Sequence, residues 1–327
     1  MTDPITASPD MSAADIPAIE ITGLSKTYRA QKGGKKGSEP KLALDNIDLT
    51  IPKGSFFALL GPNGAGKSTL INILAGLVVK TSGTAKIWGY DTDHNVRASK
   101  ASIGVVPQEI NFDPFFTPRK LLDIQAGLYG VPKAQRRTEE LLELVGLADK
   151  AESYTRSLSG GMQRRLMVAK AMVHTPPVLI LDEPTAGVDV ELRQQLWKNV
   201  KELNRQGTTI LLTTHYLEEA EELCDRIAII NHGKIIANED KETLLSRISG
   251  KSIRFRLSEE LKTVPESLAA LGLQKAGKRS LLLQYSPEDL IMARVIEAIQ
   301  AHNLTITDIS TDESHLEDIF LQLTRAA

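Results

Sequence analysis

The sequence has few of the features that mark secreted, metal-binding or membrane-spanning chains. It holds one cysteine, Cys224, which cannot form an internal disulfide, and its six histidines show no metal-ligand spacing. No run of about 18 or more apolar residues occurs, so we do not expect the chain itself to cross a bilayer. Residues 1–17 lack the basic start and apolar core of a secretory signal, and we expect a disordered tail there.

Charge of neither sign is in large excess. The 39 basic and 41 acidic residues give a formal net charge of -2, so nothing attracts the whole chain to nucleic acid, and we expect no nucleic-acid partner. What is present is ordinary for a globular protein, with 42% hydrophobic and 24% charged residues. A length of 327 residues predicts one large domain and one small domain.

Apolar runs predict an α/β fold. Residues 55–60 form a short apolar run that ends in a glycine-rich loop, as expected of a strand buried on both faces. The spacing of Leu70, Ile73, Leu74 and Leu77 predicts an amphipathic helix after that loop. Later apolar runs, separated by amphipathic helices, predict further strands of a parallel sheet at 178–181, 209–212 and 226–230.

The remaining patterns divide the chain into domains. Strands are expected at 19–22 and 44–51, on either side of a basic, turn-rich stretch, Gln31–Pro40, that we interpret as a solvated loop. The helical pattern from Phe112 to Val173 predicts an inserted helical subdomain at about residues 110–173. We expect the large domain to span 18–248.

Past Gly250 the pattern predicts a small α+β domain over 251–327, with strands at 253–257 and 281–285 between helices. One helix is expected to begin at Ser286-Pro287-Glu-Asp289, and the last opens with the capping box Ser314-His-Leu-Glu317. That last helix carries four apolar residues on one face, namely Leu316, Ile319, Phe320 and Leu323.

The loop after the first buried strand matches the P-loop pattern for binding phosphates, between a predicted strand and a predicted helix. It consists of Gly61, Pro62, Asn63, Gly64, Ala65, Gly66, Lys67, Ser68 and Thr69. Its backbone N–H groups and the helix N-terminus favour a phosphate chain. We expect Lys67 to reach the outer phosphates of ATP, Ser68 to bind Mg2+ and Thr69 to donate to an inner phosphate. The alternative is a glycine turn beside a surface lysine.

Polar residues follow two other predicted strands, at the edge where a parallel sheet binds ligands. Asp182 and Glu183 end one of them, and we expect Asp182 to bind Mg2+ and Glu183 to polarise the water that attacks the γ-phosphate. The alternative for both is an acidic cap of the next helix. His215 follows the other strand and is expected to donate a hydrogen bond to the γ-phosphate, with a structural histidine as the alternative.

The segment Leu158-Ser-Gly-Gly-Met-Gln163, just before an arginine-rich helix, resembles the signature motif of ATP-binding-cassette (ABC) ATPases. Other motifs of that family follow in order over about residues 19–240, and the resemblance implies an α/β ABC ATPase core with an antiparallel β subdomain. Tyr28 resembles the aromatic residue that stacks on adenine. Gln108 resembles the glutamine that senses Mg2+ and the attacking water, and Asp189 lies in a stretch similar to the dimer-contacting loop.

The signature motif implies a dimer. In the family its residues, here Ser159, Gly160, Gly161 and Gln163, form a second anion cradle that binds the γ-phosphate held by the opposite subunit. Hydrolysis of two ATP molecules with Mg2+ would then need a head-to-tail pair of chains. The alternative is a turn that only caps the following helix.

Three further stretches, 108–112, 213–220 and 316–323, resemble bacterial multidrug and polyketide-antibiotic export ATPases. Such subunits bind in pairs beneath separate multi-helix permeases, at the cytoplasmic face of the cell membrane. Phe112, Phe115 and Phe116 are candidates for the socket of a permease helix, or alternatively for core aromatics. An importer ATPase shares every catalytic motif. A cassette ATPase of ribosomes or DNA is disfavoured, because the chain has no second cassette and no long coiled coil.

Overall fold

The computed structural model describes residues 16–29, 40–186, 188, 190–246, 251–261, 263–285, 292–312 and 316–326. Almost all of the expected tail and of the basic stretch lies outside these ranges, as do Asp189, the helix start at 286–289 and Ser314. The chain forms two compact units, one ending at Lys241 and the other spanning Glu242–Ala326. In the described ranges no helix combines the length and the apolar character needed to span a membrane.

A six-stranded sheet forms the centre of the first unit, in the order β10-β9-β3-β8-β7-β6. Its strands are β3 (Phe56–Leu60), β6 (Ile103–Val106), β7 (Val178–Asp182), β8 (Thr209–Thr213), β9 (Arg226–Asn231) and β10 (Lys234–Asp240). All pairs are parallel except β9 with β10. Every residue of β3 and β8 is buried, because helices and a second sheet cover both faces. The predicted strands at 55–60, 178–181, 209–212 and 226–230 are confirmed; β6 and β10 were not predicted.

The second sheet of this unit is antiparallel, in the order β2-β1-β4-β5. It comprises β1 (Ile19–Tyr28), β2 (Lys41–Ile51), β4 (Ser82–Ile87) and β5 (Tyr90–Asp91). Ile19 and Ile21 alternate with polar residues and bury one face of the sheet against the apolar core that also holds β3. Helix α1 (Lys67–Leu74) belongs to the same core through Leu70, Ile71, Ile73 and Leu74.

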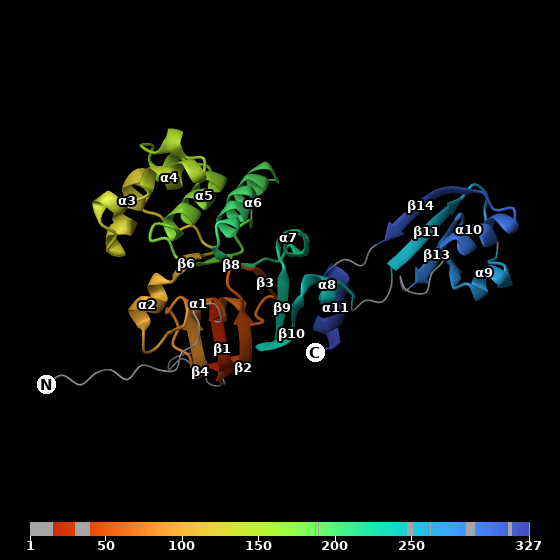
Figure 1. The fold of residues 1–327 in the computed structure, drawn as a ribbon, viewed down its shortest axis with the longest axis horizontal. Helices are drawn as coiled ribbons and strands as arrows, with labels where there is room; N and C mark the ends of the chain where they lie inside the picture. Colours follow the sequence, from red (N-terminus) through yellow and green to blue (C-terminus); the bar gives the residue numbers. More distant parts are fainter. Residues whose placement is uncertain are drawn as a thin grey trace, which may run out of the picture. The chain divides into compact units, whose positions relative to one another are not determined.

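A helical segment follows β6 in the chain and consists of α3 (Pro118–Leu128), α4 (Thr138–Leu144) and α5 (Gly160–Ala171), which pack on one another (Figure 1). Its first helix begins at Pro118, capped by the Thr117 hydroxyl, so the helical pattern inferred from Phe112 onward was wrong for residues 112–117. The remaining helices of this unit are α2 (Val96–Ala101), α6 (Val190–Arg205) and α7 (Leu217–Leu223).

The second unit has a core of its own and the chain order β-α-β-β-α-β of a split βαβ fold. Four antiparallel strands pair in the order β12-β13-β11-β14. The elements are β11 (Lys251–Leu257), α9 (Glu266–Ala270), β12 (Leu273–Lys275), β13 (Ser280–Tyr285), α10 (Met292–Ala301) and β14 (Ile306–Asp312). Phe255 and Leu281 are paired across β11 and β13 and are fully buried. Helices α8 (Lys241–Ser246) and α11 (Leu316–Ala326) flank these elements in sequence, and Leu316 and Ile319 are buried.

One aromatic pair joins the helical segment to the parallel sheet. The rings of His174 and Tyr129 stack with their centroids 3.7 Å apart and their planes 2° apart. His174 Nε2 lies 3.1 Å from the carbonyl oxygen of Ile103 in β6, so this nitrogen donates. Its Nδ1 is buried without a hydrogen-bond partner among the described residues. Burial lowers the pKa of His174 and favours the neutral ring.

Protonation of His174 should therefore destabilise the fold. Because the pKa is lowered on folding, the stability that His174 contributes is complete above its unfolded value of about 6.5 and is lost as the pH falls below it. We expect His174→Gln to reduce the loss of urea stability between about pH 7 and pH 5 relative to the wild type. The exposed His232, changed to Gln, is the control and should keep the wild-type slope. An unchanged slope in His174→Gln would contradict this assignment.

Candidate functional site

The P-loop connects β3 to α1 and shapes the floor of the site. Gly66 precedes α1 with φ at 117°, and a Cβ there would lie 2.8 Å from the carbonyl oxygen of Ala43, so only glycine fits. Gly61 is equally restricted, because a Cβ would lie 2.3 Å from the carbonyl oxygen of Ile230. The backbone therefore approaches its neighbours closely and presents the N-terminus of α1 to the site.

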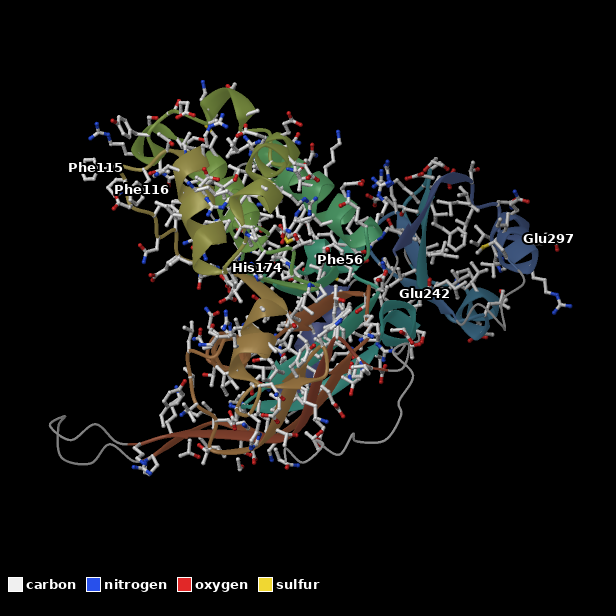
Figure 2. The ribbon with its side chains drawn as sticks, turned by 60° about the vertical axis from the view of Figure 1, so that its left-hand side comes forward. Phe56, Phe115, Phe116, His174, Glu242 and Glu297 are labelled. Carbon is white, nitrogen blue, oxygen red and sulfur yellow. The ribbon has the colours of Figure 1, made fainter. Side chains whose placement is uncertain are left out.

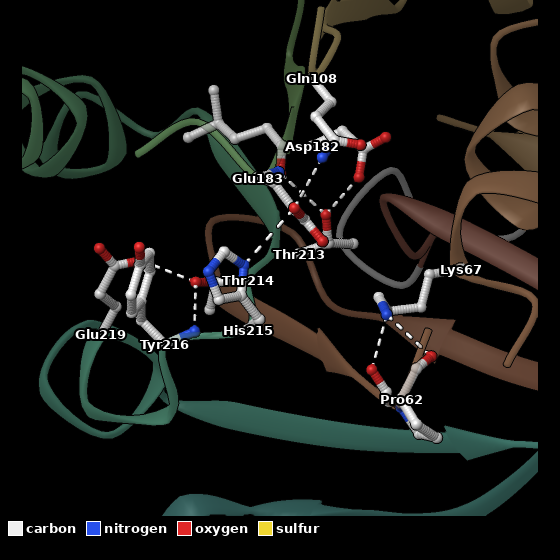
Figure 3. Close-up of polar contacts among 12 residues, drawn as sticks. Pro62, Lys67, Gln108, Asp182, Glu183, Thr213, Thr214, His215, Tyr216 and Glu219 are labelled. Atoms are coloured by element: carbon white, nitrogen blue, oxygen red, sulfur yellow. Dashed lines mark hydrogen bonds and ion pairs between the residues drawn. The ribbon is translucent and has the colours of Figure 1, made fainter. Parts of the chain in front are cut away.

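Lys67 is the cation of this floor and is 7% exposed. Its ammonium donates to the carbonyl oxygens of Gly61, at 2.6 Å, and Pro62, at 3.2 Å, so the loop folds around its own lysine (Figure 3). Burial lowers the pKa of Lys67, while the charges of Glu183 and Asp182 act in the opposite direction. A phosphate oxygen would supply the full counter-charge that two carbonyl groups do not.

Above the loop lies a cavity of about 640 Å³, within the size range of small-molecule sites. Residues from β1, β2, the P-loop and three sheet-edge loops line it, namely Tyr28, Lys41, Ala43, Asn63, Gly64, Gly66, Lys67, Ser68, Thr69, Gln108, Glu183 and His215. Tyr28 is 38% exposed, and its hydroxyl lies 3.5 Å from Thr69 Oγ1. An aromatic face is thus available next to the phosphate loop for a flat ring.

Asp182 ends β7, Glu183 follows it, and the two differ in environment. Glu183 lines the P-loop cavity, whereas Asp182 lines a neighbouring cavity of about 580 Å³. Burial raises the pKa of Asp182, and a hydrogen bond from Thr213 and the charge of Lys67 oppose this rise. Glu183 has φ at 47°, in the left-handed region that non-glycine residues rarely occupy. This backbone turn directs its carboxylate into the cavity rather than along the strand direction.

Two side chains from neighbouring loops converge on the Glu183 carboxylate. The Gln108 amide donates to Glu183 Oε2 at 2.9 Å, and His215 Nδ1 lies 3.5 Å from the same oxygen (Figure 3). The structure therefore brings together three residues that were predicted to act on the γ-phosphate or its attacking water. No cluster of three or more His, Cys, Asp or Glu side chains suited to holding a metal ion occurs in the described part of the chain.

Several residues that support this group escaped the sequence analysis. Arg164 of α5 is 6% exposed, and its Nη1 donates to the carbonyl oxygens of Pro107, at 3.1 Å, and Gln108, at 2.6 Å. It thus anchors the backbone next to the Gln108 side chain. The adjacent arginines Arg164 and Arg165 were visible in sequence, but nothing in their spacing showed that both are buried.

A second group of residues supports His215. The Tyr216 ring lies 4.0 Å from the imidazole, and its backbone N–H donates to Thr214 Oγ1 at 3.0 Å. Thr214 in turn donates to the buried Glu219 at 2.8 Å, and the Arg193 guanidinium lies 4.6 Å from the Tyr216 ring. These contacts hold the loop that carries His215, and only the folded chain reveals them.

The signature segment forms a separate feature of the chain. Ser159 caps α5 by accepting from the N–H of Met162 at 3.3 Å, and Ser159 and Gly160 are exposed while Gly161 is buried. The Gln163 amide donates to the carbonyl oxygens of Thr155, at 3.0 Å, and Leu158, at 3.3 Å. None of these residues lines the P-loop cavity. Within one chain the predicted second cradle is therefore not part of the first site.

The fold and the site together define a P-loop nucleoside triphosphatase: a largely parallel sheet, a P-loop between strand and helix, and acids at the end of a strand that one further strand separates from the P-loop strand. Comparison with known proteins narrows the class. The family model described as "ABC transporter" matches residues 44–186. The linearmycin resistance ATP-binding protein LnrL of Bacillus subtilis is 37% identical over 298 residues, which cover 89% of this chain and 96% of that protein.

A second relative, the Nod factor export ATP-binding protein I of Ralstonia nicotianae, is 33% identical and covers 97% of this chain and 96% of its own length. Among solved structures, a dimeric ATP-binding cassette in a post-hydrolysis state bound to ADP and Pi superposes with a TM-score of 0.59 at 28% identity, covering 68% of this chain and 98% of that one. The chain therefore belongs to the ABC transporter family, as an ATP-binding subunit that acts by hydrolysing ATP.

Proposed function

We propose that this chain is the ATPase subunit of an exporter and that its hydrolysis of ATP drives a separate membrane permease. One observation carries the ATPase assignment: the Glu183 carboxylate, contacted by Gln108 and His215, lies in the same cavity as the P-loop. The names of the two relatives, one an export protein and one a resistance protein, support export.

The proposed roles in binding ATP are assigned from the position of each residue around the P-loop cavity. The loop Gly61 to Gly66 binds the phosphates through its backbone N–H groups, of which Pro62 has none, together with the ammonium of Lys67, since this is the concave cationic part of the site. Thr69 donates to an inner phosphate. Tyr28 stacks on adenine, because its half-exposed ring borders the same cavity.

The residues proposed to hold Mg2+ fit that ion. Ser68 offers a hydroxyl, Asp182 a carboxylate and Gln108 an amide oxygen, all hard oxygen donors. Gln108 already uses its amide nitrogen toward Glu183, which leaves the amide oxygen for the ion. When bound, Mg2+ would neutralise charge on the outer phosphates.

The proposed reaction is an attack of water on the γ-phosphate. Glu183 accepts a hydrogen bond from that water and polarises it, while Gln108 fixes one carboxylate oxygen. Lys67 compensates negative charge on the phosphates. His215 donates to the γ-phosphate, for which its half-exposed ring at the cavity edge is suited.

We further propose that a second copy completes the site. Ser159 and Gly160 are exposed at the N-terminus of α5 and do not line the cavity of their own chain. A helix N-terminus with a free backbone binds anions, so this cradle suits the γ-phosphate held by a partner chain. Gln163 shapes the cradle by holding the carbonyl groups before it, and Asp189 belongs to the proposed contact with the partner. A dimeric form of a related cassette agrees with this arrangement.

The proposed permease site lies on the helical segment. Phe115 is 65% exposed and Phe116 is 37% exposed, so the alternative that they are core aromatics is wrong; Phe112 is half-buried. Figure 2 shows Phe115 and Phe116 at the outer edge of the segment. Exposed aromatic rings of this kind suit contact with a permease helix at the cytoplasmic face of the cell membrane, with no role for nucleic acid.

Glu183→Gln should lower the turnover number for ATP by at least about a hundredfold while ATP still binds. The amide keeps the size of the carboxylate but cannot polarise water as a base. Steady-state phosphate release and equilibrium binding of a fluorescent ATP analogue measure the two effects. Glu202→Gln, which changes a surface carboxylate paired with Arg205, is the control and should keep wild-type turnover. A near-normal rate in Glu183→Gln would remove this residue from the base role.

Ser159→Arg should block the ATP-dependent dimer while each chain still binds ATP, because a long cation would fill the exposed cradle and not the P-loop cavity. Light scattering with ATP in the Glu183→Gln background measures the dimer. Ser157→Arg, an exposed change two residues earlier, is the matched control and should dimerise normally. If Ser159→Arg dimerised as well as this control, the shared-site proposal would be wrong.

Co-purification from membranes tests the exporter assignment. We expect the tagged chain to recover a multi-helix permease and no extracytoplasmic binding protein. Phe115→Ser should reduce recovery of the permease without lowering ATP hydrolysis by the isolated chain, because this ring is exposed and does not line the P-loop cavity. Recovery of a binding protein would indicate import, and recovery of ribosomes or DNA would contradict both transport assignments.

A further inference from the structure

Thr213, the last residue of β8, contacts both acids of the site although it lines neither the P-loop cavity nor the neighbouring one. It is opposite Asp182 in the register of β7 and β8, which places the two side chains side by side. Its hydroxyl is fully buried and donates to Asp182 Oδ1 at 2.5 Å (Figure 3).

The same residue also holds the backbone of Glu183. The N–H of Glu183 donates to the carbonyl oxygen of Thr213 at 3.0 Å and to its hydroxyl oxygen at 3.2 Å. A hydroxyl has one proton and two lone pairs, so it can donate to Asp182 and accept from Glu183 at the same time. Valine has the same shape and can do neither.

The contact matters because Glu183 is held in a strained conformation. Its φ of 47° is unfavourable for a residue with a Cβ and persists only where neighbours fix it. Thr213 provides both acceptors for the N–H at this turn. The turn in turn sets the direction of the carboxylate that Gln108 and His215 contact.

We propose that Thr213 is a positioning residue for ATP hydrolysis: its hydroxyl fixes the Asp182 oxygen next to the phosphate site and the backbone turn that aims Glu183 at the attacking water. The inference rests on the proposed function. It assigns to one hydroxyl the relative placement of the two acids, which the sequence shows only as neighbours.

The chain contains a matched control for the test. Thr209 lies at the other end of the same strand, is also fully buried and also accepts a backbone hydrogen bond, from Gly54 at 2.9 Å. Thr209→Val and Thr213→Val therefore remove equivalent hydroxyl groups from one strand. Of these two hydroxyl groups, the one of Thr213 contacts Asp182 and Glu183.

Thr213→Val should lower the turnover number by at least about tenfold, with the KM for ATP within about threefold of wild type, because charge-assisted contacts are lost near the reacting groups. The factor by which Mg2+ tightens ADP binding should also shrink, which titration calorimetry measures without hydrolysis. Thr213→Ser should restore both quantities to within about threefold, and Thr209→Val should keep both. Thermal melting should show a similar loss of stability for the two valine variants.

Two results would overturn the proposal. One is wild-type turnover and Mg2+ response in Thr213→Val, and the other is an equal loss in Thr209→Val. If Thr213→Val does not fold, Thr213→Cys, whose thiol is a weaker donor, should show the same loss of turnover and of the Mg2+ effect on ADP binding. Wild-type values of both quantities in Thr213→Cys would overturn the proposal. Failure of the exporter assignment is distinguishable, because ATP hydrolysis and Mg2+-dependent ADP binding are measured on the isolated chain and do not depend on a permease.

Discussion

The parallel pairing of β3, β7 and β8 is the constraint on which the rest of the structure depends. Parallel strands end at one edge, so the P-loop, Asp182 and Thr213 meet there although more than a hundred residues separate the first from the others. Lys67 then shares a partly buried site with two carboxylates. The attraction between Lys67 and Asp182 opposes the effect of burial on the pKa of both groups, although burial remains the larger cause.

The helical segment is connected to this edge through a few buried polar contacts. Arg164 of α5 holds the backbone at Pro107 and Gln108, and Gln108 contacts Glu183. The exposed cap at Ser159 lies at the N-terminus of the same helix, five residues before Arg164. The proposed contact with a second chain at Ser159 and the backbone of Gln108 are therefore connected through one helix.

The second unit distinguishes this chain from solved structures that contain the ATP-binding cassette alone. The solved cassette aligns over 98% of its own length but only 68% of this chain, whereas the Nod factor relative covers 97% of it. The split βαβ unit has its own buried core, with Phe255 and Leu281 at its centre. The buried residues of this core all come from the unit itself.

The sequence by itself determined the local features: the buried strands, the P-loop and its helix, the acids after β7 and the cap at Ser159, because each rests on periodicity or on a short motif. It also showed the order of these motifs, which carried the resemblance to ABC ATPases. Only the tertiary structure decided which residues meet. The burial of Arg164, the exposure of Phe115 and the two hydrogen bonds through Thr213 depend on strand register and packing between segments far apart in the chain. No local pattern encodes those contacts, because a threonine at the end of a strand has the same propensity whether it faces a carboxylate or solvent.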